Sequence, residues 1–364
     1  MLLGAASGLS ACGDEVPRAT QRHPVERTAT PRPARTATPA PAPARDPVPR
    51  AARRRAAALP LDQRVGQLFV VGFEGADLQA SVFEELRGRG WGGIVVAPDN
   101  AATAAGLPVL AGEAVVTARA AGRVPPLVAA DPQLPGLPAG WAERRALGLT
   151  LSLGPDADVP IAGGDAEATA RRVTRAVRRA RDAGVAVAVG HFPGQGAASQ
   201  DPLEGPAQVG LSLEDLRTRD LVPFAAVARR ARVVVVSSAA FLALDPVTPA
   251  ALLPRTVKDL LRGELGFGGV AMSDDLAGLE AATGDSAGVA AVAAIDAGID
   301  VVHVPDPAAR DEAYRAVLAA VREGRLAPAR VRDAAARMLA LKDALGLGAA
   351  APTAPAAPPA PSPG

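Results

Sequence analysis

The sequence has few of the residues from which disulfides, metal centres and nucleic-acid interfaces are built. Its single cysteine, Cys12, rules out an intrachain disulfide and a cysteine-rich zinc site. Aromatic residues make up 3% of the chain and the net charge is +1, so the arginines lack the interleaved aromatic side chains of a nucleic-acid surface. We therefore expect no nucleic-acid partner, and we expect no cofactor.

Both ends of the sequence have almost no large apolar side chains. Residues 13–57 are rich in Pro, Ala, Thr and Arg, and residues 348–364 in Ala and Pro, which is typical of disordered segments. The intervening stretch is long enough to bury a sizeable core, since 49% of the whole chain is hydrophobic. We predict one folded domain over 58–347, between a linker and a tail.

The first residues lack an apolar run long enough to span a bilayer, which takes about 20 residues. The opening MLLGAASGLSAC instead ends in Leu9-Ser10-Ala11-Cys12, which resembles the lipobox of bacterial lipoproteins. That resemblance implies that residues 1–12 are a signal ending at a lipidated Cys12, which anchors the protein to a membrane outside the cytoplasm. The basic residues expected early in such a signal are missing. Either the true start lies upstream, or the match arises by chance.

Eight short apolar runs alternate with helix-like stretches across the predicted domain. The runs cover 67–73, 92–98, 125–131, 149–155, 185–192, 232–239, 268–275 and 299–305. Between two of them, residues 165–184 repeat Ala and Val at helical spacing, with arginines on the other face. Valine-rich runs suit strands buried on both faces, as in a parallel sheet. Eight such units predict an α/β fold, a single-domain (β/α)8 TIM-type barrel.

Polar residues at the ends of these runs favour the barrel over its alternative, a doubly wound sheet with two extra strands. In barrels of this type, functional residues gather where the strands end. The residues at or just beyond a run end are Glu74, Asp99, Asp131, Asp156, Asp158, His191, Ser237, Ser238, Asp274, Asp275 and His303. We predict a functional site on that rim. The aspartates and histidines lack the spacing of metal ligands, so we predict no metal site.

Three stretches stand out, VGFEG (71–75), GHFPGQG (190–196) and LRGELGFGGVAMSDDL (261–276). Together they resemble the N-terminal barrel of glycoside hydrolase family 3, in particular its single-domain β-N-acetylhexosaminidase branch. DLVPFAAV (220–227) and AIDAGIDVV (294–302) follow in the expected order, and the resemblance spans most of residues 60–345. It implies a partner that is a carbohydrate, a peptidoglycan-type glycan with β-linked N-acetylglucosamine.

The resemblance implies that Asp274 is the catalytic nucleophile, because it follows the serine of the Ser-Asp pair in the third stretch. In a retaining glycosidase, one carboxylate attacks the anomeric carbon while a second group about 5–5.5 Å away protonates the leaving oxygen. The alternative is that the acidic pair caps the next helix, a description that suits Asp275 better.

The resemblance also implies two sugar-binding residues, Asp131 and His191. A carboxylate such as that of Asp131 accepts charge-assisted hydrogen bonds from hydroxyl groups. The alternative for Asp131 is an Asx-turn before Pro132. His191 matches the histidine of the family's Lys-His pair, and its alternative is a hydrogen-bonded core histidine.

The chain departs from the family pattern where protons are transferred. Gly190 occupies the position of the family's lysine, and Gln195 that of its second histidine. The family's acid/base histidine is replaced by Leu203, although Asp201 keeps the aspartate of that loop. Removing a general acid typically lowers the rate about 10²- to 10⁴-fold. Glu204 and Asp201 are the nearby groups that could supply the proton instead.

Two functions therefore remain open at the level of sequence. The first is a retaining glycosidase with Asp274 as nucleophile and Glu204 or Asp201 as acid/base. The second is a barrel that has lost catalysis and serves as a membrane-anchored glycan-binding or scaffold protein.

Overall fold

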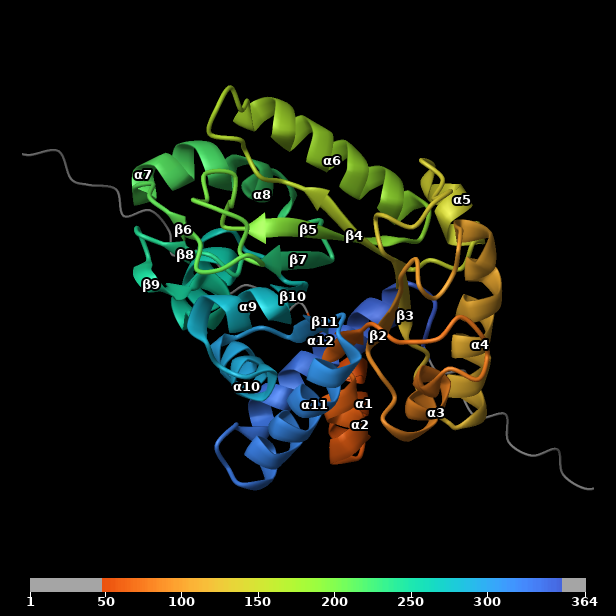
Figure 1. Cartoon of the computed structure of the whole chain (residues 1–364). Coiled ribbons are helices and arrows are strands. Elements are labelled where there is room, and N and C mark those ends of the chain that lie inside the picture. Colours follow the sequence, from red (N-terminus) through yellow and green to blue (C-terminus); the bar gives the residue numbers. More distant parts are fainter. Residues whose placement is uncertain (1–47, 349–364) are drawn as a thin grey trace, which may run out of the picture. The chain divides into compact units, whose positions relative to one another are not determined.

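Eight parallel strands curl into a barrel in the computed structural model, which describes residues 48–348 (Figure 1). The strands are β1 (Phe69–Val71), β2 (Gly93–Val96), β3 (Leu127–Ala130), β4 (Leu151–Asp156), β5 (Ala186–Phe192), β7 (Val233–Val236), β10 (Val270–Asp275) and β11 (Val301–Val304). Every one of these strands begins within one of the eight predicted apolar runs. The predicted (β/α)8 barrel is therefore confirmed.

The order of the strands explains how the sheet closes. Hydrogen-bonded neighbours follow the order β3-β2-β1-β11-β10-β7-β5-β4, which leaves β3 and β4 as the two edges. These edges meet at Thr150, whose N–H donates to the carbonyl of Val128 at 2.9 Å. The N–H of Val128 donates in turn to the hydroxyl of Thr150, also at 2.9 Å. The doubly wound alternative is wrong, because the two edges of an open sheet do not meet.

Helices surround the barrel and connect its strands. They are α1 (Arg50–Ala58), α2 (Leu61–Gly66), α3 (Ser81–Gly88), α4 (Leu107–Ala120), α5 (Trp141–Ala146), α6 (Ala166–Asp182), α7 (Leu213–Asp215), α8 (Leu221–Val227), α9 (Leu276–Thr283), α10 (Ala287–Ala297), α11 (Pro307–Arg322) and α12 (Pro328–Ala344). Helix α6 buries Val173 and Val177, as its spacing predicts, and the side chain of Asp165 caps its first turn. None of the described helices is both long and apolar enough to cross a membrane.

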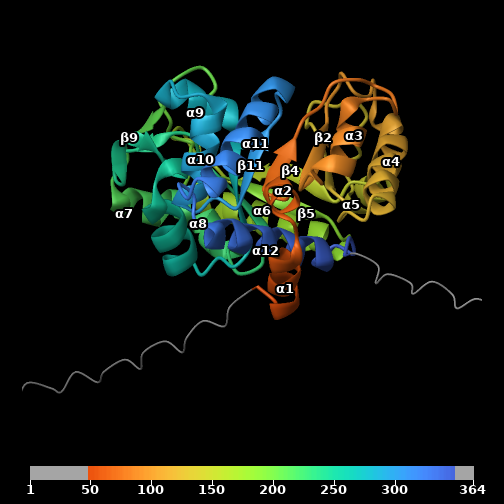
Figure 2. The ribbon, with the colours of Figure 1, turned by 90° about the horizontal axis from the view of Figure 1, so that it is seen from below.

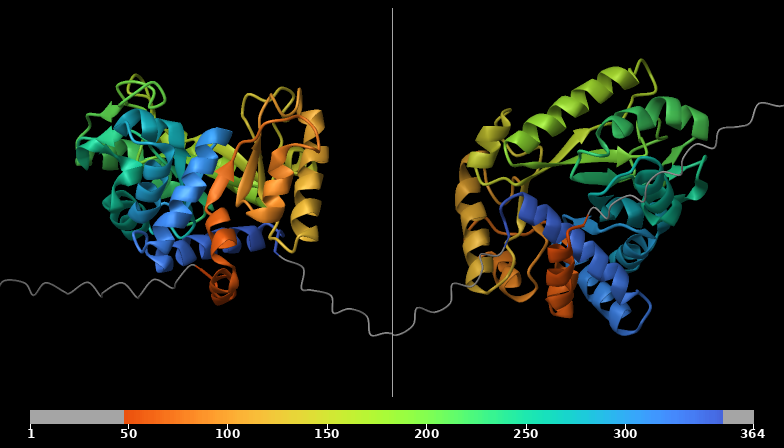
Figure 3. Two further views of the ribbon diagram at one scale, coloured as in Figure 1. Left: turned by 60° about the horizontal axis from the view of Figure 1, so that its bottom comes forward. Right: turned by 180° about the vertical axis from the view of Figure 1, so that it is seen from behind.

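Helix α12 closes the end of the barrel at which the strands begin (Figures 2 and 3). The barrel interior is filled by apolar side chains from all eight strands, among them Val70 and Met272. Met338 and Leu341 of α12 pack into that same cluster. A second, larger cluster fills the space between the strands and the surrounding helices. The interior is therefore a packed core, which leaves the opposite rim for a site.

Two features differ from the pattern expected from sequence. A three-stranded sheet of β6 (Gln208–Val209), β8 (Ala240–Phe241) and β9 (Asp245–Pro249) forms from the loops after β5 and β7. Helix α1 begins at Arg50, although the composition predicts a linker up to residue 57. Ala52 and Ala56 of α1 are buried, which accounts for a helix in so basic a segment. The rest of the predicted linker, the signal with Cys12 and nearly all of the tail lie outside the described residues.

Candidate active site

A cavity of about 410 Å³ lies where strands β4, β5, β10 and β11 end. Its titratable lining residues are Asp156, His191, Asp274 and His303, and Met272 is among its apolar lining residues. This volume falls within the usual range for small-molecule sites, roughly 300–1,000 Å³. The carboxyl ends of the strands meet at this rim, so residues far apart in sequence are brought together here.

Asp274 and Asp275 have different surroundings at the end of β10. The side chain of Asp274 lines the cavity and is 25% exposed. One of its oxygens accepts a hydrogen bond from the N–H of Asp275 at 2.9 Å. The carboxylate of Asp275 instead accepts from the N–H of Ala277 at 3.0 Å, which makes it the N-cap of α9. The capping alternative thus describes Asp275, and Asp274 remains available for chemistry in the cavity.

His191 lies between two carboxylates. Its Nδ1 is 2.8 Å from an oxygen of Asp158, and its Nε2 is 3.7 Å from Oδ1 of Asp274. Burial alone would lower the pKa of His191, but the hydrogen bond with Asp158 and the charges of Asp274, Asp158 and Asp156 raise it to about 9. The imidazole is therefore protonated at neutral pH, with carboxylates on both sides of its ring.

Asp158 is the positioning partner that sequence reasoning missed. Its Oδ1 accepts hydrogen bonds from the N–H of Gln195 at 2.6 Å and from the N–H of His191 at 3.3 Å. Burial works against its ionisation, but the hydrogen bond and charge of His191 hold its pKa below the ordinary value. Gln195 also accepts from the hydroxyl of Ser237 at 2.5 Å. Hydrogen bonds thus fix this loop beside His191.

Asp156 is the second acidic group beside His191. Desolvation of its carboxyl group and the negative charge of Asp158 raise its pKa above the ordinary aspartate value. One donor atom each from Asp156, Asp158 and His191 lie within 4.8 Å of one another, a spacing that could hold a metal ion. In this group Asp158 and His191 are already hydrogen-bonded to each other. A raised pKa is instead the property that a general acid requires.

His303 also lines the cavity, and the sequence offers no role for it. Its backbone N–H donates to the hydroxyl of Ser273 at 3.1 Å, while its buried Nε2 has no hydrogen-bond partner among the described residues. Burial lowers the pKa of His303, against the charges of Asp275, Asp274 and Asp131. It is therefore the neutral histidine of the site, with one ring nitrogen able to bond a ligand.

Asp131 lies at the end of β3, half-buried. One of its oxygens accepts a hydrogen bond from the N–H of Gln133 at 2.7 Å, which is the geometry of an Asx-turn. Pro132, and not Asp131, lines the cavity. The Asx-turn alternative therefore describes this residue in the free protein, with its second oxygen left for a ligand.

Asp201 and Glu204 lie in the loop between β5 and β6, and both are exposed. A carboxylate oxygen of Asp201 accepts from the N–H of Leu203 at 3.0 Å. Neither residue lines the cavity that holds Asp274. Of the five candidates that the sequence offers within the described residues, the structure brings together Asp274 and His191 there.

The comparisons with known proteins agree with this arrangement. Residues 140–341 match the family described as Glycosyl hydrolase family 3 N terminal domain. The chain is 38% identical over 188 residues to a Beta-hexosaminidase of Stenotrophomonas maltophilia (strain K279a), covering 48% of this chain and 55% of that protein. It is 34% identical over 192 residues to a Beta-hexosaminidase of Pseudomonas aeruginosa (strain LESB58), covering 49% of this chain and 58% of that protein. The alignments thus span little more than half the length of these relatives.

Solved structures extend the likeness to the whole barrel. A glycoside hydrolase family 3 beta-N-acetylglucosaminidase from Paenibacillus sp. str. FPU-7 superposes with a TM-score of 0.74 and 31% identity, over 82% of this chain and 65% of that one. A Beta-N-acetylhexosaminidase from Beutenbergia cavernae DSM 12333 superposes with a TM-score of 0.68 and 29% identity, over 79% of this chain and 99% of that one. The family match covers more than half of the chain, and the cavity lies at the rim of the same barrel. The chain therefore belongs to glycosyl hydrolase family 3.

Proposed function

We propose that the protein is a retaining glycosidase that acts on β-linked N-acetylglucosamine in cell-wall-type glycans. The observation that carries this proposal is the carboxylate of Asp274 in a sugar-sized cavity, 3.7 Å from the protonated ring of His191. The relatives named Beta-hexosaminidase and beta-N-acetylglucosaminidase support the choice of sugar.

In the proposed reaction, an oxygen of Asp274 attacks the anomeric carbon and the aglycone oxygen leaves with a proton. Water then cleaves the glycosyl–aspartate bond and releases the sugar. The positive charge of His191 lies beside the attacking carboxylate of Asp274, and the Nε2–H of His191 donates to a sugar hydroxyl once substrate enters. Asp158 holds the ring in this orientation through Nδ1. Asp131 and the free nitrogen of His303 are the further sugar contacts.

The nucleophile is tested by trapping the glycosyl-enzyme. A 5-fluoro N-acetylglucosaminyl trap should add one sugar to the wild-type chain, detected by intact mass, because fluorine slows the release step. Asp274→Asn should show no adduct and no turnover of an aryl β-N-acetylglucosaminide. Asp275→Asn is the matched control, since that residue caps α9, and it should keep the adduct.

The proton donor is tested through the leaving group. Asp156 lines the cavity with a raised pKa, whereas Asp201 and Glu204 do not line it, so we favour Asp156 as donor. Asp156→Asn should lower the rate on a disaccharide by about 10²- to 10⁴-fold and largely spare a dinitrophenyl glycoside, which needs no protonation. Asp201→Asn and Glu204→Gln should leave this ratio unchanged, and a shift in either variant would assign the donor to that residue.

The alternative, a glycan-binding protein without catalysis, has a distinct outcome in the same experiments. Wild-type protein would then bind N-acetylglucosamine oligomers in calorimetry, yet show no turnover and no adduct. That result would exclude the glycosidase.

We also propose an extracytoplasmic location with a lipid anchor at Cys12, on the strength of the lipobox-like sequence LSAC. Cells fed an alkyne analogue of palmitate should label the full chain, and Cys12→Ser should remove the label. Equal labelling of the variant, or none of the wild type, would contradict the anchor.

A further inference from the structure

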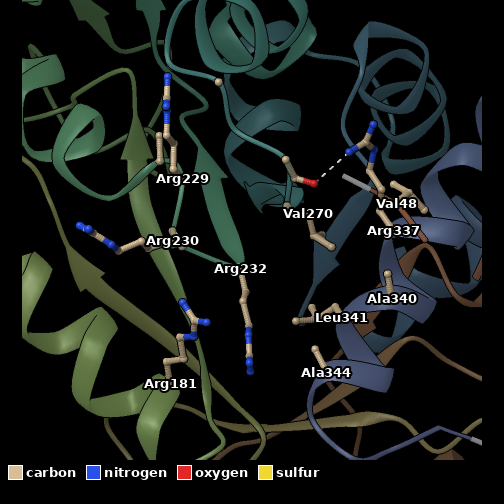
Figure 4. A pocket seen from close by; sticks show the side chains of 15 residues that line it. Val48, Arg181, Arg229, Arg230, Arg232, Val270, Arg337, Ala340, Leu341 and Ala344 are labelled. Atoms are coloured by element: carbon tan, nitrogen blue, oxygen red, sulfur yellow. Dashed lines mark hydrogen bonds between the residues drawn. The ribbon is translucent and has the colours of Figure 1, made fainter. Parts of the chain in front are cut away.

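A hollow of about 450 Å³ lies at the end of the barrel where the strands begin (Figure 4). Arg232 lies directly before β7, and Gly268 and Gly269 directly before β10. Ala340 and Leu341 of α12 form another wall. The hollow is separate from the cavity at the catalytic rim, because the two lie at opposite ends of the same strands.

Five arginines line this hollow, and four of them have no carboxylate partner. Arg337 is engaged, since it pairs with Asp300 and Asp333 and donates to the carbonyl of Gly268. The other four are Arg181, Arg229, Arg230 and Arg232. Among the described residues, none of these four has an ion pair or a side-chain hydrogen bond. Asp182 lines a neighbouring hollow together with Arg178, Arg181 and Arg230, and is the acidic group there.

Arg232 shows that the hollow concentrates positive charge. Its side chain is half-buried, and its Nη1 is buried without any hydrogen-bond partner among the described residues. Burial, together with the charge of Arg181, lowers the pKa of Arg232 below its ordinary value. In Figure 4 the side chains of Arg181 and Arg232 approach each other, while Arg230 extends to the left and Arg229 to the top of the view. An anion between Arg181 and Arg232 would offset their repulsion and accept a hydrogen bond from the unpartnered Nη1.

Several other arginines of the described residues pair with carboxylates, unlike the four of the hollow. Arg262 and Arg330 donate to the buried carboxylate of Asp300 at 2.6 and 2.7 Å. Arg310 donates to Glu85 at 2.8 Å. The guanidinium groups around Asp300 thus have a buried carboxylate as partner, whereas no carboxylate lines the hollow at Arg232.

We propose that this hollow binds phosphate groups, with Arg181 and Arg232 as the main contacts and Arg229 and Arg230 at its edge. Two adjacent guanidinium groups match the charge of a phosphate, and each can donate two parallel hydrogen bonds to its oxygens. The phosphate can belong to a lipid headgroup at a membrane surface or to a soluble phosphate compound.

The first test measures phosphate binding to the full chain with Cys12→Ser, so that no lipid is attached. Inorganic phosphate should raise the Tm relative to chloride at equal ionic strength, and should bind in calorimetry. Arg181→Ala/Arg232→Ala should lose the Tm shift and weaken binding by about tenfold or more. Arg175→Ala, an exposed arginine of α6 outside the hollow, is the matched control and should behave as the wild type.

A second variant distinguishes phosphate binding by Arg232 from a role of Arg232 in the stability of the fold. Because Nη1 has no partner to lose, Arg232→Met should keep or raise the Tm in phosphate-free buffer while it abolishes the phosphate effect. If wild-type protein shows no specific phosphate effect, or if the double variant keeps it, the proposal is wrong.

The second test distinguishes the sources of phosphate. The same proteins are sedimented with vesicles of phosphatidylglycerol or of phosphatidylcholine. Sedimentation with the anionic vesicles that the double variant loses identifies a lipid headgroup. Phosphate binding without vesicle binding identifies a soluble phosphate compound. The double variant retains all arginines before residue 48, so the assay separates the hollow from that segment.

Discussion

His191 owes its charge to the groups on either side of its ring. An isolated buried imidazole would lose its proton near neutral pH, as His303 does in the same cavity. The hydrogen bond with Asp158 and the charge of Asp274 reverse this at His191, and its pKa rises to about 9. Two histidines of one cavity thus hold opposite protonation states, so that only His191 places a positive charge beside Asp274, the proposed nucleophile.

At the scale of single residues, we predict how kcat/KM of the proposed reaction depends on pH. If protonated His191 is required, kcat/KM should fall as the pH rises through about 9. Asp158→Asn removes the partner that raises this pKa, so the alkaline limb should move to lower pH, toward the ordinary histidine value of 6.5. The measurement is kcat/KM for a dinitrophenyl glycoside, whose leaving group needs no proton from Asp156, between pH 5 and pH 10. Glu167→Gln, which removes one negative charge from an exposed position of α6, should leave the limb in place.

The raised pKa of His191 also predicts how the stability of the fold depends on pH. A histidine whose pKa is higher in the folded state stabilises the fold fully below pH 6.5, and the contribution is lost as the pH rises through about 9. Urea unfolding of wild type and His191→Gln should therefore differ most below pH 6.5 and converge above pH 9. A difference that grows with pH would contradict the assignment of the charge.

The residues of the site could be predicted from the sequence only in part. Asp274 and His191 end apolar runs and match family motifs, and both line the cavity. Asp158 could not be paired with His191, because the contact depends on the neighbouring positions of β4 and β5 in the sheet. Asp201 and Glu204 follow the motif along the chain, but their loop turns outward into solvent. Position along a motif does not determine where a loop carries its side chains.

At the scale of elements, one buried carboxylate links the last strands to α12. Asp300 directly precedes β11 and is fully buried. It accepts hydrogen bonds from Arg262, from Arg330 of α12 and from the N–H of Ala271 of β10 at 2.9 Å. Three segments are thus fixed around a single side chain, which holds α12 across the end of the barrel.

We predict that Asp300→Asn is strongly destabilising. Removing its charge leaves Arg262 without a counter-charge and Arg330 with Asp333 alone, and breaking a buried ion pair in this way typically costs about 3–5 kcal/mol. The urea midpoint should therefore fall sharply at an unchanged m-value. Glu264→Gln breaks the exposed ion pair with Arg217 and should shift the midpoint little. Equal effects of the two substitutions would show that Asp300 does not link these elements.

The elements themselves were largely predictable, for physical reasons that also explain the exceptions. Strands buried in a barrel are largely apolar, so all eight barrel strands appear as short apolar runs. The two-residue strands β6 and β8 are too short to show a period. Helix α1 is arginine-rich, so its composition is typical of a linker. Only two of its residues, Ala52 and Ala56, are buried. The packing of α1 against α12 is a tertiary effect that local composition does not encode.

At the scale of the whole molecule, the barrel separates two sites that share one strand. Val270 at the start of β10 lines the arginine hollow, and Asp274 near its end lines the catalytic cavity. Four residues of strand span roughly 13 Å. The space between is filled by packed side chains such as Met272, Val235 and Leu341, which transmit no obvious two-state change. The two sites should therefore bind their ligands independently.

This independence gives a prediction that joins the two proposals. Arg181→Ala/Arg232→Ala should hydrolyse a soluble aryl β-N-acetylglucosaminide with wild-type kcat/KM, and Asp274→Asn should bind phosphate as the wild type does. If the hollow holds the enzyme at an anionic surface, the double variant should lose activity only on a glycolipid presented in phosphatidylglycerol vesicles. Such a loss reflects a lower surface concentration of enzyme, so adding salt should reproduce it in the wild type by screening the arginines. A defect of the double variant on the soluble substrate would instead mean that the two ends of the barrel are coupled.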